Sequence, residues 1–390
     1  METCPSAKAI ASNHDVLSEI LIRLPVRSLF RFKSVSKDFL SLITTHRALS
    51  LRVNPDPSSV SGVFINPGHP YFSTGYRGLD FIPLNEDPDY EPRDLTVIPN
   101  LSAVITRCST HGLMIVAAFN EIEKTNAYHV LNPTTKQFAI LPDPHVDWPL
   151  CLGLAFNPSR SPHYKVISLS EMRYCNGQGY FQIEIYSSET GTWRCSGGSF
   201  TVDAVQLLPV DGVYWNEAIH FWSNDVYSYY FNVEEERLAR MPMPPIPEGR
   251  FYYDRCRRFM FESRDHFHVI DIYDRTQFNV FEMERDYSEW FVKYRVDLRP
   301  VVDAFPTMRQ FLNPSPNYPS PYDVLSLVRQ KKEDESCLLL NVPGKIVRYN
   351  LVDKTFEAIL DAECADESEL GLRYNGYIGL PYIKCYYSFV

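Results

Sequence analysis

The sequence predicts a mainly β protein with a small N-terminal α-helical unit, the β part being a propeller of about six blades. Aromatic residues make up 14% of the 390 residues and 29 are proline, a composition typical of a β body with many turns. A unit of strand, polar turn and second strand recurs, mostly at spacings of about 40–55 residues, which suits four-stranded blades. One segment, His14–Ile43, instead shows the apolar spacing of helices.

The helical segment is predicted to form three short helices. The first carries one continuous apolar stripe, has acidic residues in its opening turns and ends at Pro25. A second apolar set follows, and Ser36 is placed to cap a third helix. The three sets are Val16, Leu17, Ile20, Leu21 and Leu24; Leu29, Phe30, Phe32 and Val35; and Phe39, Leu40, Leu42 and Ile43. Three short helices make too small a core to bury all these side chains, so part of the stripe must face another surface.

Composition places the domain boundaries. Residues 1–13 are expected to be a disordered leader, and the helical unit is predicted to span residues 14–52. Two prolines among small polar residues mark a linker at 53–59. Because no comparable linker follows, residues 60–390 are predicted to form one large domain.

The large domain is predicted to consist of short strands separated by turns rich in Asn, Asp, Pro, Thr and Gly. In chain order these strands include 62–65, 95–98, 112–116, 128–131, 164–167, 181–186, 219–222, 229–233, 267–273, 337–340 and 346–351. The recurring unit, whose second strand usually opens on an aromatic residue, is found at 130–138, 185–193, 230–238, 270–278 and 347–356.

Two further features concern how the ring is built. The C-terminal segment Tyr382–Phe389 is expected to close the ring by pairing with an early strand, because a closed ring leaves no strand edge open. The longest interval between copies contains the proline-rich stretch Asn313–Pro321, which is predicted to be a surface excursion.

Charge is unevenly distributed along the chain. The net charge is −10, yet residues 14–52 hold seven bases and three acids. The basic helical unit should therefore attract an acidic protein, whereas the acidic remainder is a poor partner for nucleic acid. No apolar run is long enough to cross a membrane, and the first residues lack an apolar signal core. The nine cysteines show no close pairs, so reduced thiols and a cytoplasmic or nuclear location, or both, are expected.

No phosphate-binding loop, nucleophile motif or metal-ligand spacing is found, so no cofactor and no metal are expected. His266 and His268 share one face of a predicted strand, but no further ligands are suggested nearby, which favours a structural or solvent-facing role. Met241–Pro247 could be a proline-rich ligand, although an inter-strand loop is favoured, and Lys331–Glu335 is predicted to be a solvated turn.

The segment Arg250–Arg255 combines aromatic and basic residues. This is the composition of an interaction hot spot, and equally that of a blade edge. The candidate residues for binding a target protein are Arg250, Phe251, Tyr252, Tyr253 and Arg255.

The helical segment resembles an F-box of the plant type. The resemblance rests on Leu24-Pro25, Ser28-Leu29, Arg31-Phe32-Lys33 and Val35-Ser36-Lys37. The sequence departs from the family pattern in having Ser12-Asn13-His14 where Leu-Pro usually opens the motif, and Phe39 where the third helix usually carries Trp.

The resemblance implies binding to the small acidic Skp-type adaptor of cullin ubiquitin ligases. The adaptor-facing and core set is predicted to comprise Val16, Leu17, Ile20, Leu21, Leu24, Pro25, Leu29 and Phe32, with Arg23, Arg27 and Arg31 steering the encounter. The sequence does not separate adaptor-facing residues from core residues within this set.

The remainder resembles the kelch-like F-box-associated domain of plant F-box proteins. The matching segments are Gly112–Val116, Leu131–Lys136, Ala155–Pro158, Tyr164–Val166, Thr190–Arg194 and Gly212–Trp215. The resemblance implies a non-catalytic ligase subunit whose propeller presents an unidentified protein for ubiquitination. The alternatives are a binding protein that promotes no degradation and, from another class, a kelch-type propeller enzyme, which would need clustered metal ligands or paired carboxylates.

Overall fold

The computed structural model describes most of the chain. The described residues are 13–24, 26–33, 35–46, 59–67, 80–84, 101–120, 125–146, 149–176, 178–197, 200–203, 207, 210–223, 225–312, 320–361 and 377–386. Residues 1–12 of the predicted leader and nearly all of the predicted linker lie outside these ranges, as does most of the proline-rich stretch Asn313–Pro321. Asn13, the last residue of the predicted disordered leader, is instead ordered as the cap of the first helix.

Three helices form the N-terminal unit: α2 (His14–Ile22), α3 (Val26–Lys33) and α4 (Lys37–Thr45). The Asn13 side chain caps α2 by accepting hydrogen bonds from the backbone N–H groups of Asp15 and Val16, at 3.1 and 3.2 Å. The predicted cap of α4 is present, because Ser36 Oγ accepts a hydrogen bond of 3.2 Å from the Phe39 N–H. Helices α2 and α4 therefore begin where capping side chains satisfy their first N–H groups.

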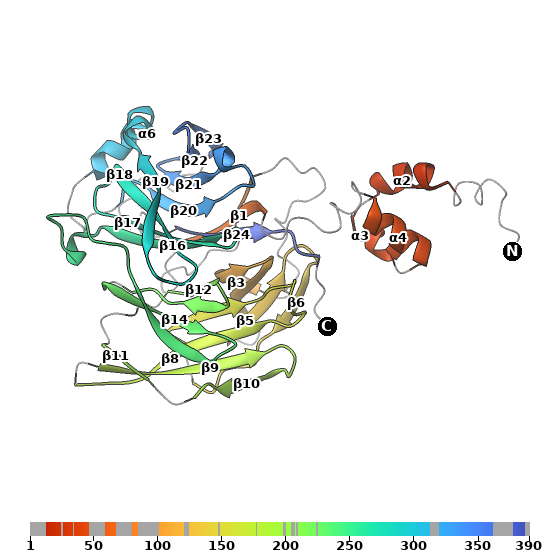
Figure 1. The fold of residues 1–390 in the computed structure, drawn as a ribbon, viewed down its shortest axis with the longest axis horizontal. Helices are drawn as coiled ribbons and strands as arrows, with labels where there is room; N and C mark the ends of the chain where they lie inside the picture. Colours follow the sequence, from red (N-terminus) through yellow and green to blue (C-terminus); the bar gives the residue numbers. More distant parts are fainter. Residues whose placement is uncertain are drawn as a thin grey trace, which may run out of the picture.

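The rest of the described chain forms six antiparallel sheets, which are the blades of a propeller (Figure 1). Blade 1 contains β24 (Tyr377–Ile383), β1 (Val60–Pro67) and β2 (Asp80–Pro83). Blade 2 contains β3 (Leu101–Thr110), β4 (Leu113–Asn120), β5 (Thr125–Asn132) and β6 (Gln137–Ile140). Blade 3 contains β7 (Cys151–Ala155), β8 (Lys165–Cys175), β9 (Gln178–Ser187), β10 (Thr192–Cys195) and β11 (Phe200–Asp203), which pairs with β9.

The other three blades have four strands each. Blade 4 contains β12 (Val213–Trp215), β13 (Ala218–His220), β14 (Tyr227–Asn232) and β15 (Arg237–Pro242). Blade 5 contains β16 (Arg257–Ser263), β17 (His266–Ile272), β18 (Gln277–Met283) and β19 (Trp290–Asp297). Blade 6 contains β20 (Asp323–Val328), β21 (Cys337–Val342), β22 (Lys345–Asn350) and β23 (Phe356–Asp361).

Short helices lie in the connections between strands. The 3₁₀ helix η1 (Tyr252–Asp254) precedes blade 5, and α6 (Arg299–Ala304) with the 3₁₀ helix η2 (Pro306–Phe311) leads toward blade 6. The 3₁₀ helix η3 (Glu333–Glu335) joins β20 to β21.

The ring of blades is closed. One end strand of each blade contacts the corresponding end strand of the next blade. Around the ring the order of these strands is β24, β3, β7, β12, β16, β20 and back to β24. The prediction of a mainly β protein with about six blades is thus confirmed, with six blades among the described residues. Radial packing buries both faces of each small sheet, so hydrophobic clusters fill the spaces between neighbouring blades.

Closure uses the C-terminal strand, but at a different position from the predicted one. Strand β24 pairs antiparallel with β1, from Val60 opposite Ile383 to Pro67 opposite Tyr377. The predicted closing strand, Tyr382–Phe389, begins where this ladder is about to end. Beyond Ile383 the chain leaves the sheet: the Cys385 N–H donates to Thr134 Oγ1 and the Cys385 carbonyl accepts from Asn132 Nδ2, at 3.0 and 2.9 Å. Residues 387–390 lie outside the described ranges.

The recurring sequence unit corresponds to the turn between the third and fourth strands in blades 2, 3, 4 and 6. The copy at 270–278 is an exception, because it is the turn between the second and third strands of blade 5. The reason is shared turn chemistry: Asp274 Oδ1 accepts from the N–H groups of Thr276 and Gln277, as Asn132 Oδ1 accepts from those of Thr134 and Thr135. The sequence pattern therefore detects this type of turn and not its position in the blade.

Candidate protein-interaction sites

The helical unit has a buried core and an exposed apolar surface. Leu21, Leu29, Leu42 and Ile43 form the core. Val16 and Ile20, one turn apart on α2, are 42% and 43% exposed, and Val35 and Leu40 are also exposed. We call Val16, Ile20, Val35 and Leu40 the apolar surface of the helical unit. Four exposed aliphatic side chains on so small a unit are typical of a protein-binding surface.

The structure divides the predicted adaptor-facing and core set. Leu21 and Leu29 are in the core, whereas Leu17, Leu24 and Phe32 are partly buried and pack against it. Val16 and Ile20 are the members that stay exposed. Sequence reasoning placed Val35 and Leu40 in apolar sets but not in the adaptor-binding set, because spacing does not show which side of a helix its neighbours cover.

The predicted steering residues differ in their surroundings. Arg23 is exposed and lies 3.8 Å from Glu19, one turn earlier on α2. Arg31 is also exposed, near the end of α3. Pro25 and the side chain of Arg27 lie outside what the structure describes.

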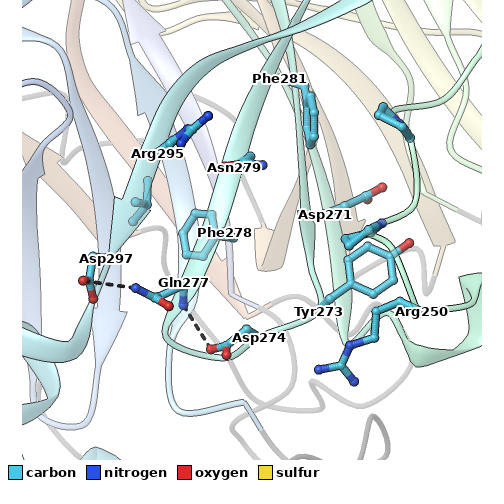
Figure 2. A pocket seen from close by; sticks show the side chains of 13 residues that line it. Arg250, Asp271, Tyr273, Asp274, Gln277, Phe278, Asn279, Phe281, Arg295 and Asp297 are labelled. Carbon is cyan, nitrogen blue, oxygen red and sulfur yellow. Dashed lines mark hydrogen bonds between the residues drawn. The ribbon is translucent and has the colours of Figure 1, made fainter.

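A pocket of about 400 Å³ lies in blade 5 (Figure 2). It is formed by the connection from β15 to β16, the turn between β17 and β18, the beginning of β18 and the end of β19. The lining residues are Pro245, Pro247, Arg250, Asp271, Tyr273, Asp274, Gln277, Phe278, Asn279, Phe281, Arg295, Val296 and Asp297. Among them, sequence reasoning proposed only Arg250 as a target-binding residue, and it singled out Pro245 and Pro247 as part of a proline-rich stretch. The other lining residues come from two further segments with no local motif.

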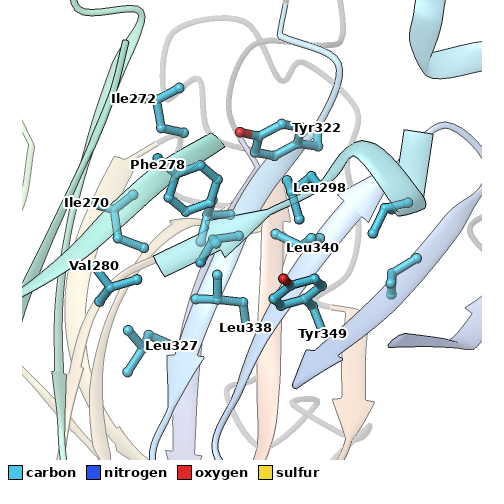
Figure 3. Packing of buried hydrophobic residues seen from close by; sticks show 14 of the residues in the cluster. Ile270, Ile272, Phe278, Val280, Leu298, Tyr322, Leu327, Leu338, Leu340 and Tyr349 are labelled. Carbon is cyan, nitrogen blue, oxygen red and sulfur yellow. The ribbon is translucent and has the colours of Figure 1, made fainter. Parts of the chain in front are cut away.

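The floor of this pocket is part of the main core. Phe278 and Val296 belong to the hydrophobic cluster that joins blades 5 and 6 (Figure 3). In that cluster the ring of Phe278 stacks near Tyr322, with centroids 6.3 Å apart. The pocket is therefore apolar at its base and rests on well-packed side chains.

The three aspartates of the pocket are held by partners within the protein. Asp271 accepts two hydrogen bonds from Arg258, at 2.6 and 2.7 Å, and lies 3.6 Å from Arg255. Hydrogen bonds from Arg299 lower the pKa of Asp297 to about 2. Burial raises the pKa of Asp274, but hydrogen bonds from Thr276 and Gln277 and the charge of Arg250 outweigh this and lower it.

Two arginines of the pocket have no such partner. Neither the Arg250 nor the Arg295 guanidinium forms an ion pair or a hydrogen bond with another residue that the structure describes. Both residues are exposed, and they lie on opposite sides of the pocket (Figure 2). The charged side chains available to a ligand here are therefore cationic.

Three exposed aromatic residues follow Arg250 directly. Phe251, Tyr252 and Tyr253 are 57%, 54% and 58% exposed, and we call them the aromatic ledge. The rings of Phe251 and Tyr253 stack at 5.1 Å, and the Tyr252 ring meets that of Tyr253 edge-on at 5.4 Å. Of the five predicted target-binding residues, four are thus at the surface. The Arg255 side chain is only 4% exposed and faces Asp271.

His266 and His268 share a carboxylate. His266 Nδ1 lies 2.6 Å from Glu282 Oε1, and His268 Nε2 lies 3.5 Å from Glu282 Oε2. Burial raises the pKa of Glu282, but hydrogen bonds from the two histidines outweigh it and hold the pKa far below its usual range. Within the part of the chain that the structure describes, no group of three His, Cys, Asp or Glu side chains is arranged to hold a metal ion.

The two remaining sequence candidates lie in ordinary connections. Met241–Pro247 forms the end of β15 and the start of the connection to blade 5, with Met241 and Met243 buried. In Lys331–Glu335, Lys332 and Glu335 form an exposed ion pair at 2.8 Å. Among the described residues, no helix has the length and apolar character needed to span a membrane.

Comparison with known proteins identifies relatives for both parts of the chain. Residues 13–50 match the family model described as "F-box domain", and residues 94–315 match the one described as "F-box protein At3g26010-like, beta-propeller". F-box protein At5g07610 of Arabidopsis thaliana is 33% identical over 383 residues, covering 91% of this chain and 87% of that protein. F-box protein At3g26010 of the same plant is 25% identical, covering 75% of this chain and 70% of that protein.

Proposed function

This chain belongs to the F-box proteins that carry a β-propeller, and on that basis we propose that it is the substrate-recognition subunit of a Skp–cullin–F-box ubiquitin ligase. The F-box would dock on a Skp-type adaptor, and the propeller would bind the protein to be ubiquitinated. The subunit would perform no chemistry; it would raise the effective concentration of target lysines near the ubiquitin-conjugating enzyme. We place this activity in the cytoplasm, the nucleus or both.

The exposed apolar surface of the F-box is the observation that carries the proposal. Val16 and Ile20 are folded into α2 yet nearly half exposed, so a partner can cover them without disturbing the core of Leu21 and Leu29. The surplus of bases in residues 14–52 supports an acidic partner, since opposite charges speed the encounter. The adaptor implied by the family is acidic.

An Ile20→Asp variant tests the proposal. Covering the part of Ile20 that remains exposed is worth about 1 kcal/mol. Placing a carboxylate in an apolar interface costs about 1–3 kcal/mol more. Because about 1.4 kcal/mol is a tenfold change in affinity, Ile20→Asp should lower co-precipitation of the adaptor from plant extract at least tenfold.

Two controls accompany this variant. Val226→Asp makes the same kind of change at a similarly exposed aliphatic residue of the propeller, and it should retain the adaptor. A target that accumulates in cells with Ile20→Asp, but not with Val226→Asp, would support a degradative role. Adaptor recovery by Ile20→Asp at the wild-type level would contradict the proposed docking surface, and adaptor binding with no stabilised target would favour a non-degradative binding protein.

A further inference from the structure

We propose that the blade 5 pocket and the aromatic ledge bind an extended segment of a partner protein in which carboxylate side chains flank an apolar one. This deepens the proposed function and rests on it in one respect: the segment would belong to the protein that the propeller presents. The site itself is built from blade 5 and the connection that leads into it.

Charge determines the sign of the occupant. The arginines in and behind the pocket are Arg250, Arg255, Arg258, Arg295 and Arg299, against the three aspartates of the lining. Each aspartate already accepts a hydrogen bond from a group in blade 5 or next to it: Asp271 from Arg258, Asp274 from the Thr276 N–H and Asp297 from Arg299. The cationic surplus therefore resides on Arg250 and Arg295. Neither guanidinium forms an ion pair or a hydrogen bond with a described residue, and Arg250 acts on Asp274 only through its charge. An anionic group is the complementary ligand.

The apolar surfaces show that the occupant is more than an isolated anion. Phe278, Phe281 and Val296 also line the pocket, which suits an apolar side chain. The aromatic ledge follows Arg250 in the chain and adds three exposed rings, two of them stacked and the third edge-on. Tyrosine and arginine are enriched at the energetic centres of protein interfaces, and aromatic rings contribute large contact area at little entropic cost.

Carboxylates fit this site better than a phosphoryl group. A phosphate dianion is held best by several clustered donors, whereas Arg250 and Arg295 lie on opposite sides of the pocket (Figure 2). Asp274 and Asp297 also line the pocket and would repel a double negative charge. Each arginine can instead pair with one carboxylate, one on either side of the apolar residue.

A peptide selection with the full-length protein tests the proposal. The probe is a library of nine-residue peptides randomised at every position, with phosphoserine included among the building blocks. We expect enrichment of Asp or Glu on both sides of Phe, Tyr, Leu or Ile. The double variant Arg250→Glu/Arg295→Glu should bind the best selected peptide at least about tenfold more weakly at low salt, and its own selection should shift to Lys and Arg.

Matched variants locate the binding. Arg237→Glu makes the same charge change at the start of β15, an exposed position outside the pocket, and should leave peptide affinity unchanged. Tyr252→Ala, at an exposed ledge residue, should weaken binding while leaving the melting transition in place. No enrichment over background, enrichment of phosphoserine over Asp and Glu, or equal affinity for the Arg250→Glu/Arg295→Glu protein would each overturn the proposal.

Adaptor binding separates this inference from the proposed function. The Arg250→Glu/Arg295→Glu protein should still co-precipitate the adaptor, because these residues belong to the propeller and not to the F-box. A wild-type protein that selects acidic peptides but recovers no adaptor would refute the ligase role and leave the pocket proposal standing. A wild-type protein that recovers the adaptor but selects no acidic peptides would refute the pocket proposal and leave the ligase role standing.

Discussion

Tyr382 is the residue through which ring closure can be measured. It lies on β24, is almost fully buried, and its ring packs edge-on against Phe64 and Phe81 with centroids 5.7 Å apart in both cases. Its hydroxyl shares a hydrogen bond of 3.0 Å with Thr134 Oγ1 in blade 2. One side chain thus joins the closing strand to both the first blade and its neighbour.

Two substitutions separate these contributions. Tyr382→Ala removes a buried aromatic ring and should lower the free energy of unfolding of the propeller by about 3–5 kcal/mol. Tyr382→Phe keeps the ring and loses the hydroxyl, for an expected loss of about 1 kcal/mol. The smaller value follows because Thr134 Oγ1 keeps its hydrogen bond from the Cys385 N–H.

Urea unfolding followed by tryptophan fluorescence measures both losses. Tyr227→Ala, at an exposed tyrosine of β14, is the matched control and should change the stability by less than about 0.5 kcal/mol. Deleting residues 377–390 should abolish the cooperative transition, because β1 then presents an open edge and β20 loses the strand of the neighbouring blade that it contacts. If Tyr382→Ala unfolds at the same urea concentration as the wild type, the contacts of Tyr382 do not stabilise the closed ring.

Two further predictions concern buried polar side chains. Burial lowers the pKa of His220 from 6.5 to about 4, so His220 stabilises the fold above pH 6.5 and this contribution is lost as the pH falls toward 4. Between pH 7 and pH 5 the free energy of unfolding of the wild type should fall by about 2 kcal/mol because of this histidine. Urea unfolding at the two pH values measures the fall, and His220→Gln should lack this contribution. Asn132→Ala should destabilise the propeller by about 1–2 kcal/mol more than Asn232→Ala in thermal unfolding. Both asparagine side chains hold a turn, but only that of Asn132 also donates a hydrogen bond to the Cys385 carbonyl. Equal effects of the two substitutions would show that this contact with the C-terminal segment contributes nothing.

The fold class was predictable because local chemistry repeats along the chain. Asn or Asp side chains that accept hydrogen bonds from the next N–H groups mark turns wherever they occur, and strands on both sides follow from their apolar and aromatic residues. The same local character explains the misplaced copy in blade 5, where Asp274 makes an equivalent turn one strand earlier. Sequence therefore predicted the number of blades better than the position of each turn within its blade.

The F-box shows a similar division. The apolar stripe of α2 is a property of sequence spacing, and it marked both the core residue Leu21 and the exposed residues Val16 and Ile20. Packing of α4 and α3 against one side of α2 decides that Leu21 is buried while Ile20, its neighbour in sequence, stays exposed. Leu24 illustrates the consequence: it packs against the core, so its replacement by Asp would test folding as well as adaptor binding.

The sequence alone determined that this protein has a three-helix unit and a propeller, because helix spacing, capping residues and turn residues act over a few positions, and motif resemblance identified the helical unit as an F-box. The pocket in blade 5 depended on tertiary structure, since its lining comes from segments around residues 245–250, 271–281 and 295–297. Strand register also decided which charges are available: Arg258 lies directly opposite Asp271 across β16 and β17 and neutralises it, while Arg250 and Arg295 have no such partner among the described residues. A charge pattern read along the chain cannot show this, because pairing depends on distances that only the folded sheet sets.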